Sequence, residues 1–128
     1  MNLIPPQVIV HDVATGRPVD YFLHEEPVYG LSVHPTNANV FVTAGSDGRV
    51  LMYDVRQKAG DEPVMLAGYS YAFHAVMFNP TEPRLIATAN QKHGLGLWDV
   101  RRPQTAVLEY GNMAGRQQTS MSVRFNRY

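Results

Sequence analysis

The sequence predicts an all-β fold built from repeated four-stranded antiparallel units. Three observations predict it: an internal repeat with a period of 45 positions, short apolar runs separated by turn-forming residues, and no sustained apolar spacing of three and four. A chain of 128 residues is long enough to bury one small core. We therefore expect a single domain assembled from repeats.

The repeat lies over residues 28–56 and 73–101, which align without a gap. The positions that are identical between the two copies are Pro35 and Pro80, Thr36 and Thr81, Thr43 and Thr88, Ala44 and Ala89, Asp54 and Asp99, Val55 and Val100, and Arg56 and Arg101. Two partial copies, IVHDV at 9–13 and SVRFN at 122–126, flank the pair. Such a repeat indicates one supersecondary unit per copy, because neighbouring copies bury each other's apolar faces.

Each copy divides into four strand-like runs. In the first copy these are VYGLSV (28–33), NVFVTAG (39–45), RVLMYDV (49–55) and PVMLAGY (63–69), and turn formers separate them. Asp47-Gly48 between two apolar runs is a strong hairpin signal. The run VLMYDV is apolar at nearly every position, which is typical of a strand covered on both faces. Four such strands per unit predict the blades of a β-propeller.

The repeat also sets the expected blade boundaries. We expect the end of a preceding blade in residues 1–23, complete blades in 24–68 and 69–119, and the first strand of a following blade in 120–128. A propeller closes with about 4–8 blades, and open sheet edges at both ends would favour aggregation. The expectation is a partial propeller that is a fragment of a longer protein.

The polar residues of the first copy resemble those of the WD-repeat family. In that family a blade has a His before its first strand, a Ser or Thr on the second, an Asp in the next turn, and an aromatic residue before the last Asp of the third strand. By position these are His24, Thr43, Asp47 and Tyr53, with Asp54 following. The resemblance implies hydrogen bonds among imidazole, hydroxyl and carboxylate that fix the turn against the next blade. It therefore implies a structural role for His24 and no catalytic one.

The second copy departs from this pattern. It keeps the hydroxyl, the aromatic residue and the acid at Thr88, Trp98 and Asp99. Lys92 and His93 replace the Asp-Gly pair, and Tyr69 stands at the position of the histidine. We expect the polar network of this blade to be incomplete and packing to hold it.

An arginine follows two positions after the last acid of each copy. Residues i and i+2 of a strand project to the same side, so Asp54 with Arg56 and Asp99 with Arg101 should form charged pairs on one rim. Arginine presents a planar five-donor fork and is enriched at interface hot spots. The pairs indicate a protein-binding rim, although each arginine can instead pair with an acid on a neighbouring loop in a purely structural role.

Two successive blades that end in Tyr-Asp-x-Arg and Trp-Asp-x-Arg resemble the substrate receptors of cullin-4 RING ubiquitin ligases. The phrases DGRVLMYDVR, FHAVMFNPTEPRLIATAN and GLWDVRRPQ share this resemblance. It implies docking on the ligase adaptor through Arg56 and Arg101, supported by Asp54 and Asp99, and recruitment of substrate proteins for ubiquitination. It also implies an intracellular location, in the nucleus, the cytoplasm or both. The alternative is a general WD-repeat scaffold of an unrelated complex.

The composition argues against other classes of function. Eleven basic residues balance eleven acidic ones, so we expect no direct nucleic-acid partner. Polar residues and a proline interrupt the uncharged window 63–81, so we expect no membrane span. The chain has no cysteine, its five histidines lack metal-ligand spacing, and we expect no metal, cofactor or enzymatic activity. Tyr69, Tyr71 and Phe73 are a weaker candidate for an aromatic cage around a methylated cation; their alternation suits packing between blades better.

Overall fold

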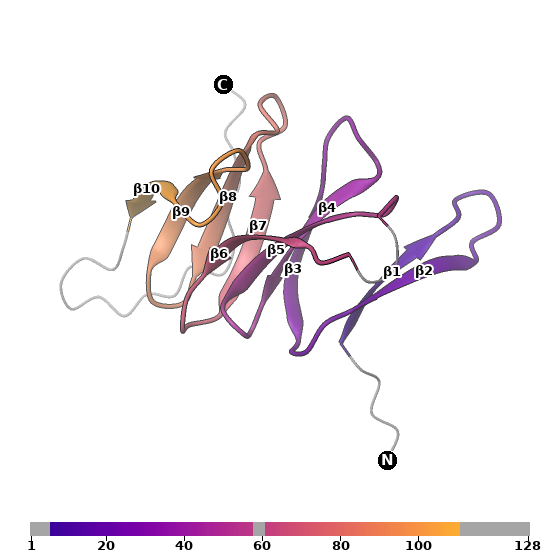
Figure 1. The fold of residues 1–128 in the computed structure, drawn as a ribbon, viewed down its shortest axis with the longest axis horizontal. Coiled ribbons are helices and arrows are strands. Elements are labelled where there is room, and N and C mark those ends of the chain that lie inside the picture. The colour runs from indigo at the N-terminus through magenta and orange to yellow at the C-terminus, as the bar shows by residue number, and fades with distance from the viewer. Residues whose placement is uncertain (1–5, 58–60, 111–128) are drawn as a thin grey trace, which may run out of the picture.

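The computed structural model describes residues 6–57 and 61–110, and these contain ten strands and no helix (Figure 1). The strands are β1 Gln7–His11, β2 Pro18–Leu23, β3 Val28–Val33, β4 Val40–Gly45, β5 Arg49–Asp54, β6 Val64–Gly68, β7 Phe73–Phe78, β8 Leu85–Asn90, β9 Gly94–Asp99 and β10 Ala106–Tyr110. The predicted all-β fold is confirmed. None of the described residues lies in a helix that could span a membrane.

The strands form two four-stranded antiparallel sheets and one hairpin. The first sheet has the order β3-β4-β5-β6, the second β7-β8-β9-β10, and β1 pairs with β2. Because consecutive strands pair in each sheet, both sheets have the meander topology of a propeller blade. The blade boundaries stay predictions, and the strand expected in 120–128 lies outside the described residues.

The two blades share one hydrogen-bond register. Val40 pairs with Asp54 in the first blade, and Leu85 pairs with Asp99 at the equivalent positions of the second. The turn between the second and third strands nevertheless differs. The residue with positive φ is Gly48 in the first blade, at 80°, and Gly94 in the second, at 72°. The loss of the Asp-Gly pair from the second blade therefore changes the turn and leaves the strand pairing intact.

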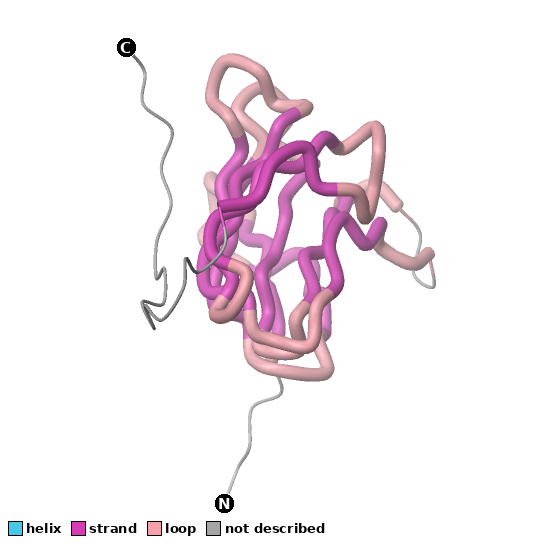
Figure 2. Tube along the Cα trace, turned by 90° about the vertical axis from the view of Figure 1, so that its left-hand side faces the viewer, coloured by secondary structure: helices cyan, strands magenta, loops and turns pink. Residues whose placement is uncertain are grey.

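The first strands of the two blades lie side by side and run in parallel. The rings of Tyr29 and His74 stack at 5.4 Å, and the Phe78 backbone N–H donates to Ser32 Oγ at 3.0 Å. Gly30 allows this approach, because a Cβ there would lie 3.1 Å from the Cα of Ala75. Each of these contacts joins residues that are about one repeat apart in the sequence, so β3 and β7 run in the same direction. The loops gather at the two ends of the strands (Figure 2).

The main core lies between the two blades. It is formed by Val42, Ala44, Val50, Leu66, Ala67, Phe73, Val76, Phe78, Ile86 and Trp98. A smaller cluster of Phe41, Leu51 and Tyr53 packs against Val8 and Phe22 of the β1–β2 hairpin. The second to sixth residues of β4 are all buried, because one blade face contacts the next blade and the other contacts the hairpin. This burial explains why the central strands are apolar at nearly every position.

Candidate functional site

The first charged pair closes the end of β5. Arg56 donates to the Asp54 carboxylate from its backbone N–H at 2.9 Å, from Nε at 3.0 Å and from Nη2 at 2.6 Å. Gln57 N–H donates to the Asp54 carbonyl at 3.0 Å, so Arg56 lies in a turn and not on the strand. The acid and the arginine therefore meet because the chain turns, which differs from the side-by-side strand placement expected from the sequence.

The second pair repeats this geometry at the end of β9. Arg101 donates to Asp99 from its backbone N–H at 2.9 Å, from Nε at 3.1 Å and from Nη2 at 2.7 Å. Arg102 N–H donates to the Asp99 carbonyl at 2.9 Å and closes the same turn. The Asp-x-Arg motif is thus a local structural unit in both blades.

Each pair combines a sheltered acid with an exposed cation. The side chains of Arg56 and Arg101 are 62% and 66% exposed, whereas those of Asp54 and Asp99 are 25% and 9% exposed. Hydrogen bonds from Arg56, first from its side chain and then from its backbone, lower the pKa of Asp54 to about 2. The equivalent bonds from Arg101 hold the pKa of Asp99 well below its ordinary range. Both pairs therefore stay ionised at neutral pH.

The two pairs lie on the same rim of the blades. β3 and β7 run in parallel, and β5 and β9 are the third strands of blades with the same topology and register. Asp54 and Asp99 therefore end their strands at the same edge, where the β3–β4 and β7–β8 loops also lie (Figure 1). This edge presents the guanidinium groups of Arg56 and Arg101 at equivalent positions of the repeat, and we call it the arginine rim.

The structural network of the first blade centres on His24. Its Nε2 lies 3.1 Å from Thr43 Oγ1 and 3.3 Å from the Tyr53 hydroxyl, and its Nδ1 lies 3.0 Å from the Phe22 carbonyl. A carbonyl only accepts, so Nδ1 carries the proton and Nε2 is the acceptor in the neutral ring. Burial is the main cause that lowers the pKa of His24. The imidazole is fully used in holding the blade, which suits a structural role.

Asp47 has a different partner from the one that the resemblance implies. Its carboxylate accepts from Arg49, at 2.7 Å from Nε and 3.1 Å from the backbone N–H, and not from the imidazole. The backbone ties this turn to the residue that follows β6, because Tyr69 N–H donates to the Gly48 carbonyl at 2.8 Å and continues the β5–β6 pairing. Arg49 lies only two residues from Asp47, so this local ion pair forms in place of a longer-range bond to the imidazole.

The second blade replaces the imidazole network with an aromatic stack. Tyr69, at the position of the histidine, lies 4.0 Å from the His93 ring and stacks on Phe73 at 5.6 Å. The Trp98 indole N–H donates to Thr88 Oγ1 at 2.9 Å. The packing expected for this blade is thus present alongside one buried hydrogen bond. Phe73 is fully buried, so the three rings considered for a cation cage form no open cage.

Asn90 is a site residue that the sequence analysis missed. Its Oδ1 accepts from the backbone N–H groups of Lys92 and His93, both at 3.0 Å, and its Nδ2 donates to the Tyr71 carbonyl at 2.9 Å. These bonds supply the turn closure that Asp47 supplies in the first blade. The signal was an Asn at the end of an apolar run and before a polar turn, a position that is typical of an Asx turn. In the part of the chain described, no three His, Cys, Asp or Glu side chains gather to hold a metal ion.

Comparison with known proteins gives the chain close relatives. No family model matches it. It is 56% identical over 120 residues to DDB1- and CUL4-associated factor 5 of Homo sapiens, which covers 94% of the chain and 13% of that protein. It is 33% identical over 79 residues to cytoplasmic dynein 2 intermediate chain 2 of Homo sapiens, covering 62% of the chain and 14% of that protein. It is also 29% identical over 97 residues to nucleoporin Nup43 of Homo sapiens, covering 75% of the chain and 25% of that protein.

These matches test the family resemblance that short stretches of the sequence indicate. The predicted resemblance to proteins that associate with cullin-4 ligases is confirmed by the first match, which is named for its association with DDB1 and CUL4. The chain spans about an eighth of the length of that relative. The similarity therefore concerns the two blades and their rim, and the remainder of the relative lies outside the comparison.

Proposed function

The chain belongs to the WD-repeat proteins, and on that premise we propose that its arginine rim docks on the adaptor of a cullin-4 RING ubiquitin ligase. In this proposal the protein is a non-catalytic substrate receptor. It binds the adaptor with one edge of its blades and recruits a substrate protein for ubiquitination with another surface. It would act inside the cell, in the nucleus, the cytoplasm or both, without a cofactor and without direct contact with nucleic acid or membrane.

The observation that carries the proposal is the twin geometry of Arg56 and Arg101. Each guanidinium is held by its own acid at two points and exposes most of its surface. An arginine that is already oriented loses less side-chain entropy on binding than a free one. Its unused N–H donors suit carboxylates and backbone carbonyls of a protein partner. The 56% identity to a protein named for association with DDB1 and CUL4 supports DDB1 as that partner.

A general WD-repeat scaffold is the second candidate, and one observation favours it. Each arginine is already satisfied by an acid two residues away, so the pair can serve only to close the turn. The chain is also similar to a dynein intermediate chain and to a nucleoporin, which are named for other assemblies. In this second candidate function, the arginine rim binds no ligase adaptor.

Co-purification separates the two functions. Full-length protein would be captured from cells and probed for DDB1, as wild type and with Arg56→Ala plus Arg101→Ala. We expect the wild type to retain DDB1 and the double variant to lose it, with substrate binding outside the rim unaffected. Arg102→Ala, an exposed neighbour, is the matched control and should retain DDB1. Absence of DDB1 from the wild-type sample, or equal recovery with the double variant, would favour the scaffold.

A further inference from the structure

The two charged pairs of the arginine rim are not equivalent. In the first blade, Arg56 is the only one of the described residues that donates to the Asp54 carboxylate. In the second blade Asp99 Oδ2 accepts from Arg101 at 2.7 Å and also from Arg84 Nη1 at 3.0 Å. The acid of the second blade therefore holds two guanidinium groups.

Arg84 is placed by the strand register. Leu85 pairs with Asp99, so the residue before Leu85 lies beside the turn that contains Arg101. The backbone secures this placement, because Val100 N–H donates to the Arg84 carbonyl at 2.9 Å. The equivalent residue of the first blade is Asn39, whose side chain is shorter and carries no charge. It therefore cannot form an ion pair with Asp54.

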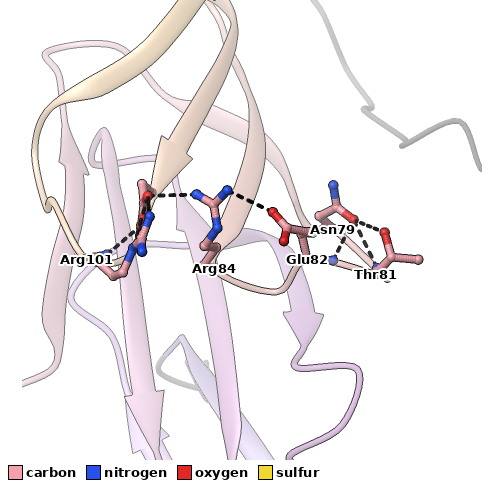
Figure 3. Close-up of polar contacts among 6 residues, drawn as sticks. Asn79, Thr81, Glu82, Arg84 and Arg101 are labelled. Atoms are coloured by element: carbon pink, nitrogen blue, oxygen red, sulfur yellow. Dashed lines mark hydrogen bonds and ion pairs between the residues drawn. The ribbon is translucent and has the colours of Figure 1, made fainter.

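The loop before β8 holds the other side of Arg84. Its Nη2 lies 2.8 Å from Glu82 Oε2, and Figure 3 shows Arg84 between Glu82 and Arg101. Glu82 is itself held in place, since its backbone N–H donates to Asn79 Oδ1 at 3.0 Å and its carbonyl accepts from Leu85 N–H at 2.9 Å. Both ends of the Arg84 guanidinium are thus attached to ordered groups.

This arrangement affects Arg101 through Asp99. The additional hydrogen bond that Asp99 accepts from Arg84 restrains its carboxylate. The Asp99 side chain is also less exposed than that of Asp54. A restrained carboxylate holds the Arg101 fork in one orientation, and pre-orientation lowers the entropic cost of docking.

We propose that Arg84 is a positioning residue for Arg101, and that it makes the second blade the stronger half of the arginine rim. This inference rests on the proposed function, because the affinity that Arg84 improves is that for the adaptor. A third arginine acting through Asp99 has no counterpart in the first blade, so the two halves of the rim should respond differently to substitution.

The test is a double-mutant cycle on the affinity of the full-length protein for purified DDB1. Arg84→Gln should weaken binding by about three- to tenfold, which is less than the loss of a charge-assisted hydrogen bond to the adaptor itself, because Arg84 acts only through Asp99. In the Arg101→Ala background the same change should have no further effect. In the Arg56→Ala background its effect should multiply that of Arg56→Ala, because distant sites act independently. Arg102→Gln is the matched charge control and should bind like the wild type.

Each outcome separates the inference from the proposed function. Loss of binding with Arg101→Ala but full binding with Arg84→Gln would overturn the inference and leave the adaptor proposal standing. So would equal effects of Arg84→Gln with and without Arg101. No binding by the wild type would overturn the adaptor proposal itself. Should Arg84→Gln lower the melting temperature, Arg84→Lys decides: it keeps one bond to Asp99, so recovered affinity supports the inference and no recovery contradicts it.

Discussion

The indole N–H of Trp98 donates to the hydroxyl of Thr88 across the β8–β9 hairpin, and both side chains are buried. At the equivalent position of the first blade, the Thr43 hydroxyl binds the His24 imidazole. The same hydroxyl position therefore binds a residue of its own hairpin in the second blade and a residue that precedes the first strand in the first blade. The blades keep the same strand pairing with different polar partners.

The contribution of the buried Thr88 hydroxyl to stability can be tested with a substitution that preserves the shape of the side chain. Thr88→Val leaves the indole N–H without an acceptor, and an unsatisfied buried donor costs about 1–3 kcal/mol of unfolding free energy. Denaturant unfolding followed by the fluorescence of the single tryptophan, Trp98, measures this loss. In the Trp98→Phe background the same substitution should cost much less, measured by circular dichroism. An equal cost in both backgrounds would show that the hydrogen bond is not responsible.

Stability should depend on pH through His24. Burial lowers the pKa of this imidazole below its ordinary value of 6.5. Below pH 6.5 the unfolded chain binds the proton more readily than the folded chain, so stability is fully present above that pH and falls as the pH drops through it. Melting temperatures from about pH 7.5 to about pH 5.5 measure the slope. His24→Gln should show a shallower slope, and an unchanged slope would assign the effect to other groups.

The tight contact at Gly48 should make that position intolerant of a side chain. Its φ is +80°, and a Cβ there would lie 1.9 Å from the Tyr69 carbonyl oxygen. Gly48→Ala adds this overlap to the conformational cost of about 1–2 kcal/mol that positive φ imposes on other residues. Gly16→Ala is the matched control, since its φ is +71° with nothing within 4 Å. We expect the larger fall in melting temperature for Gly48→Ala; similar falls would mean that the contact is relieved easily.

The arginines of the rim should matter little for stability. Arg56 and Arg101 are mostly exposed, and exposed ion pairs contribute little to stability because solvent screens them. Arg56→Ala and Arg101→Ala should therefore change the melting temperature only slightly, as measured by circular dichroism. A large loss of stability in either variant would show that the pair has a structural role and would weaken its use as evidence for docking.

Much of the fold follows from the repeat. The predicted runs of the first copy coincide with β3 to β6 to within about one residue at each end, because apolar runs and turn formers act locally. The pairing of Asp54 with Arg56 and of Asp99 with Arg101 also follows from sequence, since each involves residues two positions apart. The placement of His24 near Thr43 and Tyr53 depended on the family resemblance, because these residues are far apart along the chain.

Other features have no local signal. Nothing in the sequence around Arg84 indicates that it reaches Asp99, fifteen residues later, because that contact exists only once β8 and β9 pair in one register. The sequence likewise gives no sign that the rings of Tyr69 and His93 meet. Each depends on which of several chemically suitable partners lies nearest after packing.

The sequence alone determined the strands, their pairing within each blade and the local charged pairs, because periodic burial and turn chemistry act over a few residues. Only the tertiary structure decided which polar side chains share a partner and how closely the first strands of the two blades approach each other. The physical reason is that hydrogen bonds and ion pairs depend on distances of a few ångströms, and packing sets those distances between residues that the sequence keeps apart.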